Sequence, residues 1–190
     1  MFFNYVKTKN KKLYDNLNQG LSDNEITKLC ENLGFSLPEE IRYLYNLKNG
    51  FKTNIKLPID QCLMFEDGLF LSLQKGTEEY ELLKYENNMA YKLPIFESGF
   101  GDFLLVDDDV QSKTYKQILI WSPSLLIVDP ITIYDSLVQL MMTTIRSFVI
   151  KAYYYDKHYA LQVDDEKFHE VARDCNCQSL YWDWIAEKNK

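Results

Sequence analysis

Apolar residues recur at helical spacing in two stretches near the start of the chain. The first follows Ser22, and Glu25 stands at the capping-box distance from it, so the hydroxyl and the carboxylate can satisfy free amides at a helix start. The apolar stripe of this helix consists of Ile26, Leu29, Cys30 and Leu33. Gly34 then supplies the left-handed stop that ends many helices.

The second helix is predicted to begin at Pro38, because the fixed φ of proline suits a first helical turn. Its apolar stripe consists of Ile41, Leu44 and Tyr45. Asn49 and Gly50 mark its end. Only a few residues join the two helices, which predicts that they pack as a hairpin.

Short apolar runs separated by turn residues replace the helical spacing in the middle of the chain. Strands are predicted at 62–65 and 69–73, joined by a loop that contains Gly68. A short acidic helix is expected from Thr77 to about Tyr85. Further strands are predicted at 92–97, 102–106, 117–121 and 125–128. Strands joined by such short turns favour an antiparallel sheet over a parallel one.

Helical spacing returns in a long segment predicted from Thr132 to about Tyr155, and one more helix is predicted from about Asp164. The fold class is therefore α+β, with a mostly antiparallel central sheet packed by helices. We expect one domain over residues 1–155, with residues 156–190 forming a C-terminal helical extension packed on it. Ten apolar positions are expected to share one core: Ile26, Leu29, Leu33, Ile41, Leu44, Leu104, Ile118, Leu140, Ile145 and Phe148.

The charge balance narrows the classes of partner. The 190 residues include 28 acidic and 21 basic side chains, a net charge of −7, and the arginines are Arg42, Arg146 and Arg173. Arginine is the side chain that forks onto phosphate and guanine, so an acidic chain with few arginines is a poor nucleic-acid binder. Opposite charge favours a basic protein partner. The alternative is that the net charge serves solubility alone.

No segment predicts export or membrane insertion. The start of the chain is apolar first and basic afterwards, the reverse of a signal peptide. Asp135, Arg146 and Lys151 interrupt the most apolar long segment. We therefore expect a cytoplasmic protein with no membrane contact, whose four cysteines stay reduced. Its oligomeric state is left open.

The sequence contains only weak motifs for metal binding or catalysis. Cys175, Cys177 and His169 offer three metal ligands, but zinc sites usually have two to four residues between paired cysteines and a fourth ligand. A core thiol with an exposed neighbour is the favoured interpretation, so no metal or other cofactor is expected. No nucleotide-binding or serine-hydrolase motif occurs in the sequence, although a Cys–His pair that meets only in space stays an alternative.

Two stretches resemble the SMI/KNR domain of the SUKH superfamily. The first runs Gly34-Phe35-Ser36-Leu37-Pro38-Glu39-Glu40, continues through Tyr43-Leu44-Tyr45-Asn46 and ends at Asn49-Gly50. The second runs Leu93-Pro94-Ile95-Phe96-Glu97-Ser98-Gly99-Phe100-Gly101-Asp102-Phe103-Leu104-Leu105-Val106-Asp107. With the long helix from Thr132, the resemblance covers about residues 21–152, and 156–190 lie outside it.

The resemblance implies an α+β fold and a binding module without a shared catalytic constellation. Bacterial members are mostly immunity proteins that neutralise a toxin, often a nuclease, delivered between competing cells. Fungal members regulate cell-wall assembly. We therefore expect an immunity protein that occludes a cognate, basic toxin. The alternatives are a housekeeping adaptor on the same fold and a small enzyme that uses cysteine and histidine.

The candidate partner-binding residues are five acids and one tyrosine: Glu97, Asp102, Asp107, Asp108, Asp109 and Tyr154. The acids follow or end two neighbouring predicted strands, so several should lie close together and imitate phosphate toward a basic surface. The alternative is that they are solvated turn formers. For Asp102, a role in capping the turn amides is favoured over catalysis. Tyr154 lies in a run of three tyrosines that a helix cannot bury together, and exposed tyrosine favours protein interfaces.

Overall fold

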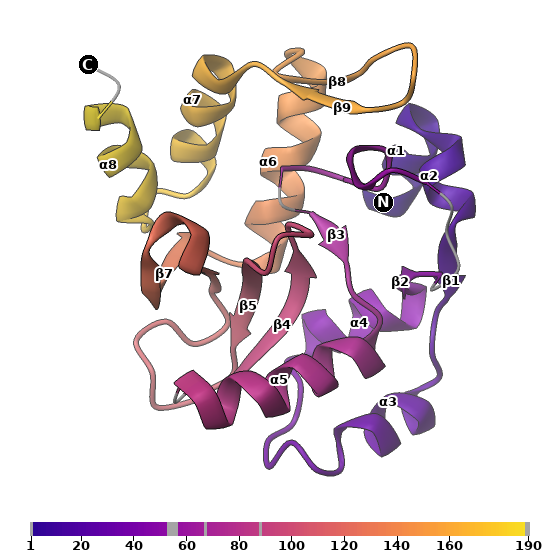
Figure 1. Ribbon diagram of the computed structural model, residues 1–190, viewed down its shortest axis with the longest axis vertical. Coiled ribbons are helices and arrows are strands. Elements are labelled where there is room, and N and C mark those ends of the chain that lie inside the picture. Colours follow the sequence, from indigo (N-terminus) through magenta and orange to yellow (C-terminus); the bar gives the residue numbers. More distant parts are fainter. Residues whose placement is uncertain (1, 53–56, 67, 88, 189–190) are drawn as a thin grey trace.

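An antiparallel sheet of five strands forms the centre of the computed structural model, which describes residues 2–52, 57–66, 68–87 and 89–188 (Figure 1). The strand order is β3-β4-β5-β6-β7, and every neighbouring pair is antiparallel. The strands are β3 Leu69–Phe70, β4 Lys92–Glu97, β5 Phe103–Asp107, β6 Ile118–Ser122 and β7 Ile127–Tyr134. The predicted antiparallel sheet and the α+β class are confirmed.

The central strand β5 is buried along its whole length, because both faces of the sheet are covered. Leu104 and Ile120 are paired and belong to the large core. Leu105 and Leu119 are paired on the other face and belong to a smaller cluster with Leu83. Successive side chains of a strand point to opposite faces, and this alternation explains the two clusters.

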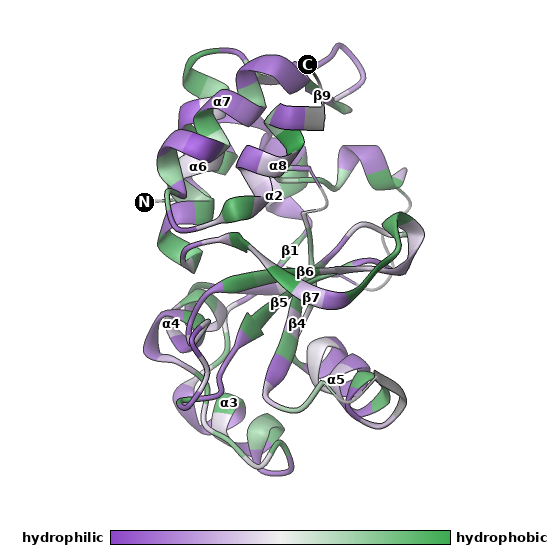
Figure 2. Cartoon of the chain, turned by 90° about the vertical axis from the view of Figure 1, so that its left-hand side faces the viewer, coloured by the Kyte–Doolittle hydropathy of each residue, from purple (hydrophilic) through white to green (hydrophobic). Residues whose placement is uncertain are grey.

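Helices flank the sheet in two groups. Figure 2 shows α6, α7 and α8 above the strands and α3, α4 and α5 below them. The helices are α1 Phe2–Lys9, α2 Lys11–Asp15, α3 Asp23–Cys30, α4 Glu39–Leu47, α5 Leu73–Asn87, α6 Leu137–Val149, α7 Asp165–Cys175 and α8 Leu180–Lys188. Short 3-10 turns occupy Ile59–Gln61 (η1) and Pro123–Leu125 (η2), and two small antiparallel pairs are β1 Leu17–Gln19 with β2 Lys48–Phe51, and β8 Tyr153–Tyr155 with β9 Leu161–Val163.

The predicted start of α3 is confirmed in atomic detail. The backbone amide of Ser22 donates to the Glu25 carboxylate at 2.8 Å, and the amide of Glu25 donates to the Ser22 hydroxyl at 3.4 Å. Gly34 has a φ of +81°, as the predicted left-handed stop requires. All ten residues expected in one core belong to the large core or pack against it, with Leu29 and Ile145 partly buried.

The prediction for the strand around residues 62–65 is wrong, and so is the predicted start of the acidic helix. Residues 62–65 form turns after η1. Helix α5 begins at Leu73 rather than Thr77, because the Ser72 hydroxyl accepts the amide of Lys75 at 3.2 Å. Gly76 lies inside this helix, where a Cβ atom would stand 2.6 Å from the Pro94 carbonyl oxygen of β4. This glycine permits a close approach of helix and strand, so it does not mark a break.

The long helix was predicted too early and too long. Thr132 belongs to β7, and α6 begins at Leu137 after Ser136, whose hydroxyl accepts the amide of Gln139 at 3.1 Å. The helix ends at Val149, and Lys151 has a φ of +61°, which turns the chain into β8. The three tyrosines thus lie on a strand, where alternation buries Tyr153 and exposes Tyr154.

Residues 156–188 are tied to α6 and to the segment that follows β7 by polar contacts. The buried side-chain amide of Asn176 donates to Thr143 Oγ1 of α6 at 3.0 Å, and its oxygen accepts the amide of Asp135 at 3.1 Å. The expected boundary between residues 155 and 156 falls at the turn of the β8–β9 hairpin. Among the described helices, none combines the length and the apolar character that a membrane crossing needs.

Candidate functional site

The five predicted acids do not form one cluster. In the β4–β5 hairpin Glu97 pairs with Phe103 at one end and Lys92 pairs with Asp107 at the other. Glu97 and Asp102 therefore flank the hairpin turn, while Asp107 and the two acids after it lie at the opposite end of the sheet. The expectation that adjacent strand ends would bring these acids together is wrong, because the residues come from opposite ends of an antiparallel pair.

Asp102 is bound within the fold. Its carboxylate accepts hydrogen bonds from the hydroxyls of Ser122 at 2.8 Å and Ser124 at 2.7 Å, and from the amide of Ser124 at 3.3 Å. Ser98 also donates to it at 3.4 Å. The carboxylate thus joins the β4–β5 turn to the β6–β7 turn. The role is structural, but the expected capping of the amides in its own turn is not seen, because the amide of Phe100 donates to Ser98 Oγ at 3.1 Å and the one amide bound by Asp102 belongs to Ser124. These bonds leave little of the carboxylate for a partner.

Asp107 and Asp108 are buried, with exposed fractions of 0% and 6%. The Asp107 carboxylate accepts the amide of Asp109 at 3.1 Å and the hydroxyl of Thr114. Burial, with the neighbouring charge of Asp107, raises the pKa of Asp108 to about 6. Both residues are covered because the β5–β6 loop folds back over the strand end, where the amide of Lys116 donates to the Asp107 carbonyl at 2.7 Å. The expectation that these two acids meet a partner is corrected accordingly, and so is the alternative that they are solvated.

Glu97 and Tyr154 lie in different places again. Glu97 is half-buried at the end of β4, where burial and the charge of Glu79 raise its pKa. Tyr154 is 51% exposed on β8 and borders a depression of about 730 Å³ that Lys9 and Lys151 also line. The surroundings of Tyr154 are therefore basic. Tyr154 does not lie beside the acids that were predicted to bind the partner with it.

A second acidic surface, which the sequence analysis did not identify, lies on α4. Six residues line a depression of about 490 Å³ there, and we call them the α4 face: Asp23, Glu39, Glu40, Arg42, Tyr43 and Asn46. Helix α4 turns its apolar stripe toward the core, so the remaining positions point outward. Tyr43 is 63% exposed, which is a large apolar area on a charged helix.

The α4 face is held in place by bonds to neighbouring elements. Asn46 Nδ2 donates to the Leu21 carbonyl at 2.9 Å and to Asp23 Oδ1 at 3.3 Å. Arg42 Nη2 lies 3.6 Å from Asp23 Oδ1 and 3.3 Å from Thr27 Oγ1. The arginine thus compensates Asp23 and leaves Glu39 and Glu40 as the further carboxylates around Tyr43.

The predicted acidic run ends beside the α4 face. Lys116 Nζ, in the β5–β6 loop, lies 3.8 Å from Glu40 Oε2, and the charge of Glu40 also acts on Asp108. Asp109, half-buried in the same loop, accepts the amide of Gln111 at 2.9 Å. Of the three acids of the run, Asp109 is therefore the one with part of its side chain exposed, in the loop whose Lys116 contacts the α4 face. The sequence signal for the face was available: Tyr43 falls outside the apolar stripe, two positions after Ile41.

The possible metal ligands near the C-terminus contribute to packing and to a local polar contact. Cys175 Sγ accepts a hydrogen bond from Arg146 Nη1 at 3.0 Å, and the His169 ring packs 6.0 Å from the Trp182 ring. All four cysteines are free thiols. Within the described ranges, no three histidine, cysteine, aspartate or glutamate side chains gather as metal ligands would.

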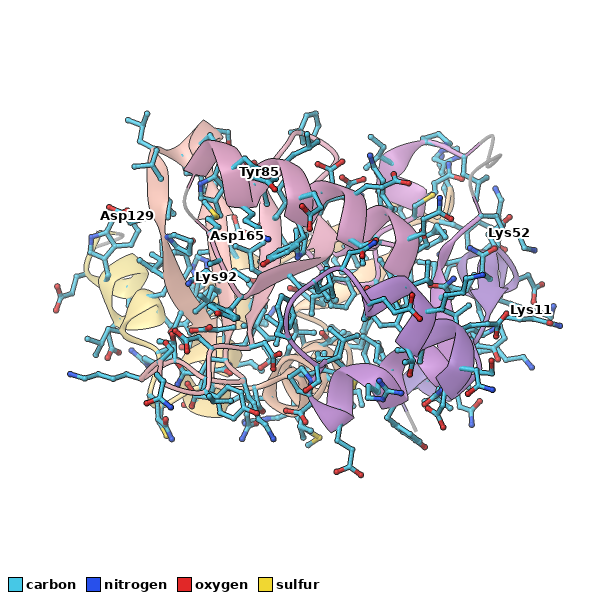
Figure 3. All side chains as sticks on the ribbon, turned by 90° about the horizontal axis from the view of Figure 1, so that it is seen from below. Lys11, Lys52, Tyr85, Lys92, Asp129 and Asp165 are labelled. Atoms are coloured by element: carbon cyan, nitrogen blue, oxygen red, sulfur yellow. The ribbon has the colours of Figure 1, made fainter. Side chains whose placement is uncertain are left out.

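Basic residues gather at one end of the molecule. Lys7 and Lys9 are on α1, Lys11 and Lys12 on α2, and Lys48 on β2, with Lys52 directly after it. Figure 3 shows Lys11 and Lys52 at one end, with Asp129 at the opposite end. These six lysines give this end of the molecule a local excess of positive charge, although Lys11 is paired with Asp15.

Comparison with known proteins agrees with this geometry. The model of the SMI1 / KNR4 family (SUKH-1) matches residues 20–143, which contain the whole α4 face and the five-stranded sheet. The matched segment carries 10 basic and 19 acidic residues, a net charge of −9, so it is more acidic than the chain as a whole. No curated protein matches the chain.

Proposed function

Because the chain belongs to the SMI1 / KNR4 family (SUKH-1), we propose that it is a non-catalytic cytoplasmic immunity protein that binds a basic toxin and covers its working surface. A nuclease is the toxin class that fits best, since such enzymes present a basic surface to phosphate. The observation that carries the proposal is the α4 face, where the exposed Tyr43 lies among three carboxylates, of which Asp23 and Glu40 have an ion-pair partner and Glu39 has none among the described ion pairs.

The two kinds of group on this face have different tasks. The carboxylates of Glu39, Glu40 and Asp109 attract a basic surface over distance and raise the association rate. Tyr43 supplies a rigid ring with a polar tip, the type of side chain that anchors protein interfaces once water is excluded. A basic toxin docked here would have its substrate surface blocked by the bulk of this chain.

The thiols and histidines support a role without catalysis. Burial raises the pKa of Cys30 to about 11, and burial also raises the pKa of Cys62, so both resist ionisation. Burial lowers the pKa of His169, whose ring packs against Phe168 and Trp182. His158 lies on the β8–β9 turn, where its backbone amide donates to Asp156 Oδ1 at 2.8 Å.

The second candidate function is a housekeeping adaptor on the same fold. It uses the same α4 face, but its basic partner is not a toxin. The exposed tyrosine on a charged helix favours this candidate as much as it favours immunity, since both need a protein interface. A neutralisation experiment separates them.

The experiment expresses the C-terminal domain of the large protein encoded directly upstream of this gene, with and without this chain. Immunity predicts growth arrest that the chain relieves, together with a stable complex of the two proteins. The variant Glu39→Lys/Glu40→Lys should lose the relief. The matched control Glu166→Lys/Glu170→Lys reverses the same charge on α7 and should keep it. A partner that binds without any toxicity would favour the adaptor, and no binding at all would refute immunity.

A further inference from the structure

The outer edge of β7 and the exposed side of α8 form an apolar groove away from the α4 face. The groove has a volume of about 720 Å³, and its apolar lining includes Leu126, Val128, Ile131, Leu180 and Trp184. Val128 is 63% exposed and Leu180 is 78% exposed. The α8 wall belongs to residues outside the family match, whereas the β7 wall belongs to the match.

The backbone of β7 is available along the first half of its outer edge. β7 ends the strand order, and no described strand pairs with its outer side. The second half is occupied, because Ser179 Oγ donates to the Thr132 carbonyl at 2.8 Å and Trp182 Nε1 donates to the Ile133 carbonyl at 2.6 Å. These bonds fix α8 beside the strand. The segment Ile127–Ile131 is left facing the groove.

Leu126, at one end of the groove, does not serve the packing of the fold. Its φ of +61° places it in the left-handed region, which favours glycine or asparagine, and its side chain is 86% exposed. A leucine here carries a backbone cost and contributes no burial. Exposed apolar groups that cluster in a concave place are typical of binding sites.

The charge at the groove is negative. Asp129 belongs to its lining, and the exposed Asp183 precedes Trp184 on α8. A second copy of this chain, with its net charge of −7, would bring Asp129 against another acidic molecule. An apolar segment that carries lysine or arginine suits both the apolar walls and the acids.

We propose that this groove binds an extended segment of a partner protein in which apolar residues alternate with lysine or arginine. The apolar side chains enter between Val128 and Leu180, and a basic side chain pairs with Asp129. An extended segment can hydrogen-bond to a sheet edge, but the register of β7 against β6 shifts between Ile127 and Ile131, so the edge is irregular there. Pro130 lacks an amide hydrogen, so these bonds are few and the side chains carry most of the binding. The occupant rests on the proposed function, as a segment of the same basic partner.

The test uses a peptide probe and no toxin. A capped nine-residue peptide of alternating leucine and lysine is titrated into the full chain while backbone amide resonances are followed, and the matched peptide has glutamate in place of lysine. The lysine peptide should shift the resonances of 126–131 and 180–184 in a saturable way. The glutamate peptide should bind at least about tenfold more weakly, since Asp129 repels it.

Two variants and one control decide the outcome. Val128→Asp should weaken the lysine peptide about tenfold or more, because it places a charge where an apolar side chain enters. Asp129→Lys should reverse the preference between the two peptides. The control Leu82→Asp changes an equally exposed apolar residue on α5 and should leave binding unchanged. Circular dichroism of each variant verifies the fold.

Three results would overturn the groove proposal. They are lysine-peptide shifts that spread outside the groove, equal binding by Val128→Asp and Leu82→Asp, and a concentration-dependent dimer that Val128→Asp abolishes. If the lysine peptide does not bind in the groove but the chain still binds the toxin, the groove proposal is refuted and the proposed function is unaffected. If the lysine peptide binds in the groove but the chain binds no toxin, the groove proposal is supported and the immunity function is refuted.

Discussion

The hydroxyl of Ser122 donates a hydrogen bond to Asp102 across 20 residues of chain, with 2.8 Å between Oγ and Oδ1. Because Asp102 also accepts from Ser124, one carboxylate couples the two turns at the same end of the sheet. Hydrogen bonds to a charged acceptor are stronger than those between neutral groups.

Replacing Asp102 should therefore destabilise the protein. Asp102→Ala leaves the Ser122 and Ser124 hydroxyls without their acceptor, and the free energy of unfolding should fall by about 1–3 kcal/mol. Urea unfolding followed by circular dichroism measures this loss. Asp129→Ala removes an exposed acid of β7 and should change stability by less than about 0.5 kcal/mol. Equal losses in both variants would contradict the coupling of the turns.

Stability should depend on pH through Asp108. Its pKa is about 6 in the folded protein against 3.8 for a free aspartate, so the folded state holds the proton more tightly than the unfolded chain. The contribution of this group is complete below about pH 4, and it is lost as the pH rises through 6, at a cost of about 1–3 kcal/mol.

The variant Asp108→Asn tests that dependence. It should be more stable than the wild type at pH 7 and should differ little from it at pH 3.5, where Asp108 is protonated in the folded protein and mostly protonated in the unfolded chain, whereas asparagine carries no charge at either pH. Denaturant midpoints at the two pH values measure the difference. The control Asp129→Asn changes an exposed residue, and its denaturant midpoint should equal that of the wild type at both pH values. A constant difference between Asp108→Asn and the wild type would rule out the titration of Asp108 as the cause.

A pair of substitutions on α6 tests the core. Leu140 is fully buried and Val138, two residues away on the same helix, is 58% exposed. Leu140→Ala should lower the free energy of unfolding by about 2–5 kcal/mol, because it leaves a cavity in the core. Val138→Ala should cost less than about 0.5 kcal/mol. Thermal or denaturant unfolding of the two variants separates the predictions.

Binding kinetics test whether Tyr43 of the α4 face controls dissociation of the partner while the carboxylates of this face control its association. Tyr43→Ala should speed dissociation of the basic partner, with a loss of about 2 kcal/mol if the ring is an anchor. Glu39→Gln/Glu40→Gln should slow association and reduce its salt dependence, while dissociation changes less. Tyr85→Ala alters an exposed tyrosine on α5 and serves as the control. An unchanged dissociation rate for Tyr43→Ala would remove the tyrosine from the interface.

Leu126 offers a variant in which stability and binding should separate. Leu126→Asn relieves the left-handed backbone and removes no buried surface, so stability should stay equal or rise by up to about 1 kcal/mol. Affinity for the leucine–lysine peptide should fall. Calorimetry of unfolding and the peptide titration measure the two effects. A clear loss of stability would show that Leu126 serves the fold.

The local signals of the sequence predicted the fold well where short-range chemistry decides it. The Ser22–Glu25 box specifies the start of α3 without help from distant residues, whereas the helix ends at Cys30, before the left-handed Gly34. Thr132 misled the prediction because its neighbours suit a helix as well as a strand, and the choice depends on pairing with Leu119 of β6. The cap at Ser136 was the signal that places the true start of α6.

The site was harder to predict, because burial of a carboxylate depends on the whole fold. Asp107 appears as a strand-end acid in the sequence, but its Thr114 partner comes from a loop that returns over the strand. The position of Glu40 beside Lys116 likewise joins two segments far apart in the chain. Tyr43 was accessible to sequence reasoning, since it falls outside the stripe of its own helix.

The separation of lysines at one end from carboxylates elsewhere gives the molecule a permanent electric dipole moment. The field of a positively charged body exerts a torque on such a dipole before any contact is made. The chain should therefore rotate during the approach so that its carboxylates lead and α1 and α2 trail. Fewer encounters are then wasted on unproductive orientations, and this gain disappears when counterions shorten the range of the field.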